Sequence, residues 1–149
     1  MENNRKILII TDTSDQMQSL AARITAVIMN PPFERYSIIT TEVEQFSTTE
    51  LLPAQVFFLG CQNKESFSNE YLEDLFTHIN LAGRSCGIFS PDARAIIHLE
   101  KLVADSDVTV GKPLFIKNDT VEDADLQNWV QGIMHHTYLK GVLLSSYGN

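Results

Sequence analysis

The sequence predicts an α/β protein with a doubly wound parallel sheet, whose helices cover both faces and give three layers. Two observations carry this prediction. Five apolar runs rich in β-branched and aromatic residues alternate with segments of helical periodicity along the 149 residues. The first, third and fourth runs are almost continuously apolar, as strands are when both faces of the sheet are covered. Right-handed crossovers between the alternating elements give a doubly wound sheet, and the buried character of the first, third and fourth runs places them in its middle, so we expect five strands in the order 2-1-3-4-5.

The apolar runs give the bounds of the predicted strands. The first four runs are Lys6–Thr11, Tyr36–Thr40, Gln55–Gly60 and Ser85–Ser90. The fifth strand is split or late, because a short run at residues 108–110 is followed by a second run at residues 114–116.

Four helices are predicted between and after these strands. Thr13 or Ser14 provides the N-cap of the first, and Ser68 or Asn69 that of the second. Each helix has an apolar stripe at helical spacing, which contains Met17 in the first, Leu72 in the second, Leu99 in the third and Trp129 in the last, at about residues 121–140. Gly83 is expected to end the second helix, and a short helical turn is expected between residues 42 and 53.

Composition limits the function classes. Hydrophobic residues make up 44% and charged residues 20%, which is typical of one globular domain, here predicted over residues 1–149. A net charge of -8 argues against a nucleic-acid partner, since such proteins usually carry a basic face. No apolar run approaches the roughly 18 residues of a membrane span, and no signal peptide is recognisable, so we expect no membrane partner and a cytoplasmic location. Two cysteines, Cys61 and Cys86, are too few for a disulfide framework or a four-cysteine zinc site.

Ligands of doubly wound sheets bind beyond the carboxyl ends of the strands. This rule selects three loops, at residues 11–17, 61–67 and 90–95. None of them contains a glycine-rich phosphate loop or a helical pair of histidines at zinc-binding spacing. Any site here is therefore built from isolated polar side chains.

Three segments resemble the flavodoxin family. The opening Lys6-Ile-Leu-Ile-Ile is followed by the hydroxyl-rich turn Thr11-Asp-Thr-Ser14, as at the start of a flavodoxin. Val56-Phe-Phe-Leu-Gly60-Cys61 is similar to the third strand of the family and its Gly-Cys ending. Gly87-Ile-Phe-Ser90 and the late Asp125-Leu-Gln-Asn-Trp129 are similar to the remainder. The resemblance implies a flavodoxin-like fold and, in ordinary members, an FMN cofactor and electron transfer.

The first loop departs from the family pattern for FMN phosphate. Thr13 and Ser14 fit the hydroxyls that bind the phosphate at a helix N-terminus, but Asp15 stands where the family has a glycine and Met17 where it has a hydroxyl residue. A carboxylate about 5 Å from a phosphate costs about 3 kcal/mol at an effective dielectric constant of about 20. Asp12 and Asp15 therefore oppose the cofactor.

The other two loops lack the aromatic residues on which flavodoxins stack the flavin ring. Residues 61–66 and 90–95 contain none, and Phe67 and Tyr71 are expected in the core or on the surface instead. Each missing stacking partner costs about 1–3 kcal/mol, by analogy with base stacking. We therefore expect a flavodoxin-like binding or interaction module that has lost tight FMN binding, with no catalytic residues and no metal. The alternative is a divergent flavodoxin that binds FMN and carries electrons.

The resemblance and the three loops together define the candidate cofactor-binding residues, as remnants of the family site. They are Thr11, Asp12, Thr13, Ser14, Asp15, Gln16, Cys61, Gln62, Asn63, Ser90 and Asp92.

Two other interpretations fit parts of these loops. Asp12, Ser90 and Lys117 fit parts of a phosphoacceptor receiver domain, but Gly60-Cys61-Gln62 leaves no aspartate to phosphorylate after the third strand. An enzyme would use Cys61 as its nucleophile, with Lys64 lowering the pKa of the thiol. The predicted partner is an unknown protein, and the apolar tail at residues 141–147 suggests a homodimer.

Overall fold

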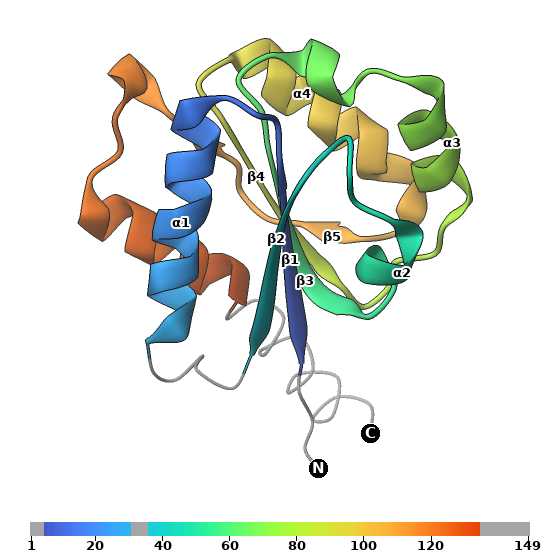
Figure 1. The fold of residues 1–149 in the computed structure, drawn as a ribbon, viewed down its shortest axis with the longest axis horizontal. Helices are drawn as coiled ribbons and strands as arrows, with labels where there is room; N and C mark the ends of the chain where they lie inside the picture. The colour runs from blue at the N-terminus through green and yellow to red at the C-terminus, as the bar shows by residue number, and fades with distance from the viewer. Residues whose placement is uncertain (1–4, 31–35, 135–149) are drawn as a thin grey trace.

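The computed structural model of the protein describes residues 5–30 and 36–134. Its sheet is parallel, with the order β2-β1-β3-β4-β5 (Figure 1). The short β6 pairs with the same edge of β4 as β5, further along that strand. The predicted strand order is confirmed. The strands are β1 (Lys6–Thr11), β2 (Ser37–Glu42), β3 (Ala54–Gly60), β4 (Ser85–Ser90), β5 (Thr109–Val110) and β6 (Leu114–Phe115).

The split of the fifth strand is also confirmed. β5 pairs with the start of β4, where Ser85 lies opposite Thr109, and β6 pairs with its end, where Phe89 lies opposite Leu114. Gly111 still donates its N–H to the carbonyl of Cys86 in β4 at 3.0 Å, and Lys112 and Pro113 lie between the two paired segments. Proline has no N–H to donate, so this edge of the sheet is interrupted rather than continuous.

Helices flank the sheet on both faces. Their bounds are α1 (Asp15–Met29), α2 (Thr48–Leu51), α3 (Glu70–His78), α4 (Ala93–Val103) and a last helix whose described part covers residues 123–134. Short 3-10 turns follow at η1 (Lys64–Phe67), η2 (Ala104–Ser106) and η3 (Lys117–Asp119). Residues 135–140, the end of the predicted last helix, and the tail proposed for a homodimer lie outside the described residues.

Side-chain caps begin three of these helices. The Ser14 hydroxyl accepts a hydrogen bond from the N–H of Met17, Asn69 caps α3, and Asp92 caps α4. The predicted ending of α3 at Gly83 is wrong. The helix ends at His78 with Ile79 as its C-cap, and Gly83 supplies the left-handed φ of 87° in the turn before β4.

Two hydrophobic clusters lie on opposite faces of the sheet because successive strand residues alternate in direction. Leu8 and Phe57 belong to the cluster under α3 and α4, whereas Ile9 and Phe58 belong to the cluster under α1 and the last helix. Burial of both faces explains why β1, β3 and β4 are almost continuously apolar.

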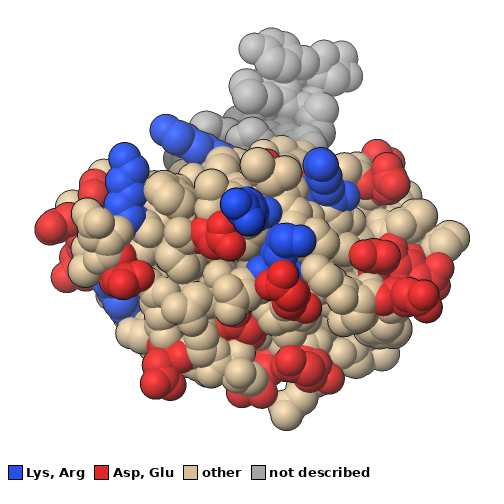
Figure 2. All heavy atoms as spheres, turned by 90° about the horizontal axis from the view of Figure 1, so that it is seen from above, with Lys and Arg blue, Asp and Glu red and all other residues tan. Residues whose placement is uncertain are grey.

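Parallel pairing places the carboxyl ends of β1, β3 and β4 at one end of the molecule, at the top of Figure 1. Figure 2 shows this end face-on, with acidic and basic side chains interspersed over the part of the chain that is described. Within that part, no helix is long and apolar enough to cross a membrane.

Candidate functional site

The centre of the candidate site is Asp12, the first residue after β1. Its side chain is buried, with 7% of the residue exposed. Its backbone N–H donates to the carbonyl of Gly60 at 3.2 Å, which joins the end of β1 to the end of β3. The turn from β1 into α1 therefore lies against the loop that follows β3.

The Asp12 carboxylate accepts three hydrogen bonds from these two loops. Oδ1 accepts from the backbone N–H of Ser14 at 3.2 Å and from its hydroxyl at 2.7 Å. Oδ2 accepts from the N–H of Gln62 at 2.6 Å and lies 3.4 Å from the hydroxyl oxygen of Ser66, whose proton is donated to the carbonyl of Asn63. Backbone N–H groups and small hydroxyls at the start of a helix are the donors with which proteins bind anions. Asp12 therefore acts as an internal anion within the loop.

The remaining residues of the first loop divide into buried and exposed ones. Thr11 is buried, and its hydroxyl accepts from Nε2 of Gln18 at 3.3 Å, while the same amide donates to the carbonyl of Asp12 at 3.0 Å. Thr13 and Asp15 are exposed. Of the two hydroxyls predicted to meet a phosphate, that of Ser14 is engaged by the chain itself, as is the hydroxyl of the candidate residue Thr11.

Cys61, at the end of β3, is fully buried. Burial, with the nearby charges of Asp12 and Asp92, raises the pKa of this thiol to about 12. The predicted lowering of its pKa by Lys64 is therefore wrong. At neutral pH the group is a thiol, and the thiolate that nucleophilic catalysis needs is not formed.

The polar residues after β3 and β4 stabilise the turns in which they lie. The Ser90 hydroxyl donates to the carbonyl of Cys61 at 2.6 Å and accepts from the N–H of Asp92 at 3.0 Å. The Asp92 carboxylate accepts from the N–H of Arg94 at 3.0 Å at the start of α4. The carbonyl of Asn63 accepts from the hydroxyl of Ser66 at 2.7 Å.

No aromatic ring from these two turns is placed for stacking on a ligand. Phe67 is buried with 1% exposed, and Tyr71 is 57% exposed on the outside of α3, as the sequence predicted. Among the described residues, no group of three or more His, Cys, Asp or Glu side chains is arranged to hold a metal ion.

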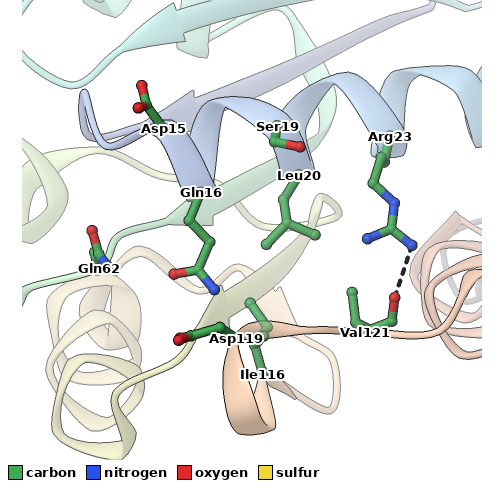
Figure 3. A pocket seen from close by; sticks show the side chains of 9 residues that line it. All are labelled: Asp15, Gln16, Ser19, Leu20, Arg23, Gln62, Ile116, Asp119 and Val121. Carbon is green, nitrogen blue, oxygen red and sulfur yellow. Dashed lines mark hydrogen bonds between the residues drawn. The ribbon is translucent and has the colours of Figure 1, made fainter.

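Gln16 takes no part in the Asp12 network. It lines a cavity of about 470 Å³ between α1 and the segment that leads from β6 to the last helix (Figure 3). Both polar atoms of its amide are buried, with no hydrogen-bond partner among the described residues. An unpaired buried polar group costs about 1–3 kcal/mol, so this amide is an exception among buried polar groups.

Two members of the network were missed by the sequence analysis. Ser66 reaches Asp12 across 54 positions of the chain, and no pattern in the sequence links the two. Gln18, whose side-chain amide donates to the carbonyl of Asp12, was also missed. Its position one helical turn after Ser14 is a signal that could have found it, because long polar side chains at the start of a helix can reach back to the preceding loop.

Comparisons with known proteins agree on the architecture. No family model matches the sequence, and no curated protein matches it. Among solved structures, a short-chain flavodoxin associated with a non-canonical PDU bacterial microcompartment has a TM-score of 0.72 at 12% identity, covering 91% of this chain and 99% of that chain. A Streptococcus pneumoniae flavodoxin has a TM-score of 0.70 at 9% identity, covering 88% and 98%. Flavodoxin 2 from Bacillus cereus has a TM-score of 0.68 at 18% identity, covering 88% and 99%. On this structural likeness, the chain has the flavodoxin-like fold.

Proposed function

We propose that this protein is a flavodoxin-like binding or interaction module that does not bind FMN tightly. The observation that supports the proposal is the buried carboxylate of Asp12, which takes up the N–H and hydroxyl donors at the start of α1. A phosphate entering this loop would compete with Asp12 for these donors and would also meet its negative charge. The loop residues present therefore do not fit the phosphate group of FMN.

The turns after β3 and β4 support the same proposal. Residues 61–66 and 90–95 include no aromatic residue, and Tyr71 on α3 is an exposed side chain. The buried Cys61 thiol, with its raised pKa, offers no nucleophile in place of a cofactor. The proposed activity is therefore binding, and an unidentified protein is one partner that we propose for it.

Titration of the purified protein with FMN, followed by quenching of flavin fluorescence, tests the proposal. We expect a dissociation constant above about 1 µM, because charge repulsion and missing stacking each remove about 1–3 kcal/mol from the affinity. Sub-micromolar binding at physiological salt would contradict it and favour the alternative, a divergent flavodoxin that carries electrons.

Two variants separate the effects of the two aspartates. Asp12→Ala frees the donors of Ser14 and Gln62 and removes the buried charge, so we expect affinity for inorganic phosphate to rise about tenfold or more. Asp15→Gly removes an exposed charge that water and salt already screen, so its gain is smaller. Equal gains in the two variants would show that the buried carboxylate is not what closes the loop.

A further inference from the structure

We infer that the cavity beside α1 is a binding site for an uncharged nucleobase or nucleoside. The inference names a ligand class for the proposed binding module and rests on that proposed function. It starts from the Gln16 amide, whose nitrogen and oxygen are both buried and unpaired among the residues described. Native proteins satisfy nearly all such groups, so a buried carboxamide that finds no partner in the protein is a place where a water or a ligand can supply one.

The cavity has the size and composition of a small-molecule site. Its volume of about 470 Å³ lies within the range of about 300–1,000 Å³ typical of ligand pockets. Leu20 and Ile116 are 3% and 2% exposed and provide apolar surface, whereas Asp15, Ser19 and Asp119 are exposed around them. Figure 3 shows Gln16 extending from α1 towards the segment that carries Asp119 and Ile116. The cavity therefore combines an apolar wall, one buried carboxamide and an acidic rim.

The amide selects a ligand with a donor beside an acceptor on one planar edge. A carboxamide offers an N–H group next to a carbonyl, so it forms two hydrogen bonds to such an edge. This is how glutamine pairs with N6 and N7 of adenine. Uracil presents the same pattern with its N3–H and an adjacent carbonyl. The flat faces of either base would lie against the apolar wall.

The rim excludes phosphorylated ligands. Asp15 and Asp119 contribute two negative charges, while the cation that lines the cavity, Arg23, is already engaged. Its guanidinium donates to the carbonyl of Val121 at 2.8 Å and pairs with the Asp123 carboxylate at 2.6 Å. A dianionic phosphate would be repelled here, whereas the hydroxyls of a ribose would donate to the rim carboxylates.

The rim of the cavity is formed by exposed side chains. The amide atoms of Gln16 are shielded from water in the structure, but Asp15, Gln62 and Asp119 at the edge are exposed side chains. Exposed side chains change rotamer within picoseconds to nanoseconds, so a base can reach the amide without unfolding of α1.

The test follows the side-chain amide signal of Gln16 in ¹⁵N-resolved NMR spectra, assigned by its loss in Gln16→Leu. The probes are adenosine and uridine at concentrations up to about 1 mM. Purine riboside, which lacks the exocyclic amino group of adenosine, tests the donor, and AMP tests the charge of the rim. We expect the Gln16 amide to shift with adenosine, with uridine or with both, and these two arms identify the base.

Affinity measured by calorimetry completes the test. Gln16→Leu and the use of purine riboside should each weaken binding about tenfold, a difference of about 1.4 kcal/mol. AMP should bind more weakly than adenosine, and the gap should narrow at high salt. The matched control Gln45→Leu, at an exposed glutamine outside the cavity, should bind as the parent does.

Three results would overturn the inference: no shift of the Gln16 amide with either nucleoside, equal affinity in Gln16→Leu and the parent, or AMP binding as tightly as adenosine. These results are distinct from failure of the proposed function. Tight FMN binding would contradict the proposed function. The nucleoside titrations test the cavity separately, and they would still do so if FMN bound tightly and Gln16→Leu left FMN binding unchanged.

Discussion

The hydrogen bonds of Asp12 make a quantitative prediction about stability. Asp12→Asn keeps the shape of the side chain but removes its charge and replaces one acceptor oxygen with an NH₂ group. In the present structure, both oxygens face donors: Oδ1 faces the N–H and hydroxyl of Ser14, and Oδ2 faces the N–H of Gln62. Whichever way the amide turns, its NH₂ group meets an N–H donor.

The size of the effect follows from the number and type of these bonds. Hydrogen bonds to a charged group contribute about 1.5–3 kcal/mol each, against about 1 kcal/mol for a neutral pair. Weakening the bonds on one oxygen and losing those on the other predicts a decrease of about 2–4 kcal/mol in the free energy of unfolding. For a chain of this length, that corresponds to a fall of about 5–15 °C in melting temperature.

The assay is urea unfolding followed by the fluorescence of Trp129, with thermal unfolding by circular dichroism alongside. Trp129 packs edge-on against Phe58 and Phe89, at centroid distances of 5.5 and 5.9 Å, so its emission reports the core. Glu44→Gln is the matched control, since it removes one negative charge from an exposed side chain and should change stability by less than about 0.5 kcal/mol. If Asp12→Asn unfolds at the same urea concentration as this control, the carboxylate does not stabilise the loops and the reasoning is refuted.

Three further predictions concern the packing of the strands and the cysteines. In Gly60→Ala the new Cβ would lie 2.2 Å from the ring of Phe89, so the free energy of unfolding measured in urea should fall by about 1–3 kcal/mol. The control Gly132→Ala places its Cβ in open space in the last helix and should leave the free energy of unfolding unchanged or raise it. Equal stability of the two variants would contradict the close packing of Gly60 against Phe89. A thiol reagent at about pH 8 should modify Cys61 far more slowly in the folded protein than in the protein unfolded in urea, because burial and nearby carboxylates keep the pKa of the thiol high. Equal rates of modification in the two states would show that the thiol is accessible. Burial raises the pKa of Cys61 to about 12 and also raises that of Cys86, so the unfolded chain loses these thiol protons first as the pH rises from about 9. The free energy of unfolding should therefore fall between about pH 9 and 12, and it should fall less steeply in Cys61→Ala. A free energy of unfolding that stays constant over this range would contradict the raised pKa values.

The strands and the main helices could be predicted from the sequence because the signals that determine them are local, and the continuous apolar character of the first, third and fourth runs indicated the middle of the sheet. A run such as Lys6–Thr11 is apolar at successive positions, which only a strand buried on both faces requires. The spacing of Met17, Leu20 and Ile24 fits one face of a helix, and Ser14 is a residue type that caps it. The ending of α3 was less predictable, because glycine at a turn and glycine at a helix end look alike in sequence.

The chemistry of the candidate site was decided by tertiary structure. From the sequence, Asp12 and Asp15 are two similar acidic residues in one loop, but only Asp12 is carried inside, where the approach of Gln62, 50 residues away, gives its second oxygen a partner. Lys64, three residues after Cys61, suggests a lowered pKa for the thiol from the sequence. In the folded chain the pKa is raised instead, because burial and the nearby carboxylates of Asp12 and Asp92 penalise the thiolate. Hydrogen bonding and desolvation depend on groups that folding brings together from distant parts of the chain, and their effect cannot be computed from the order of the residues alone.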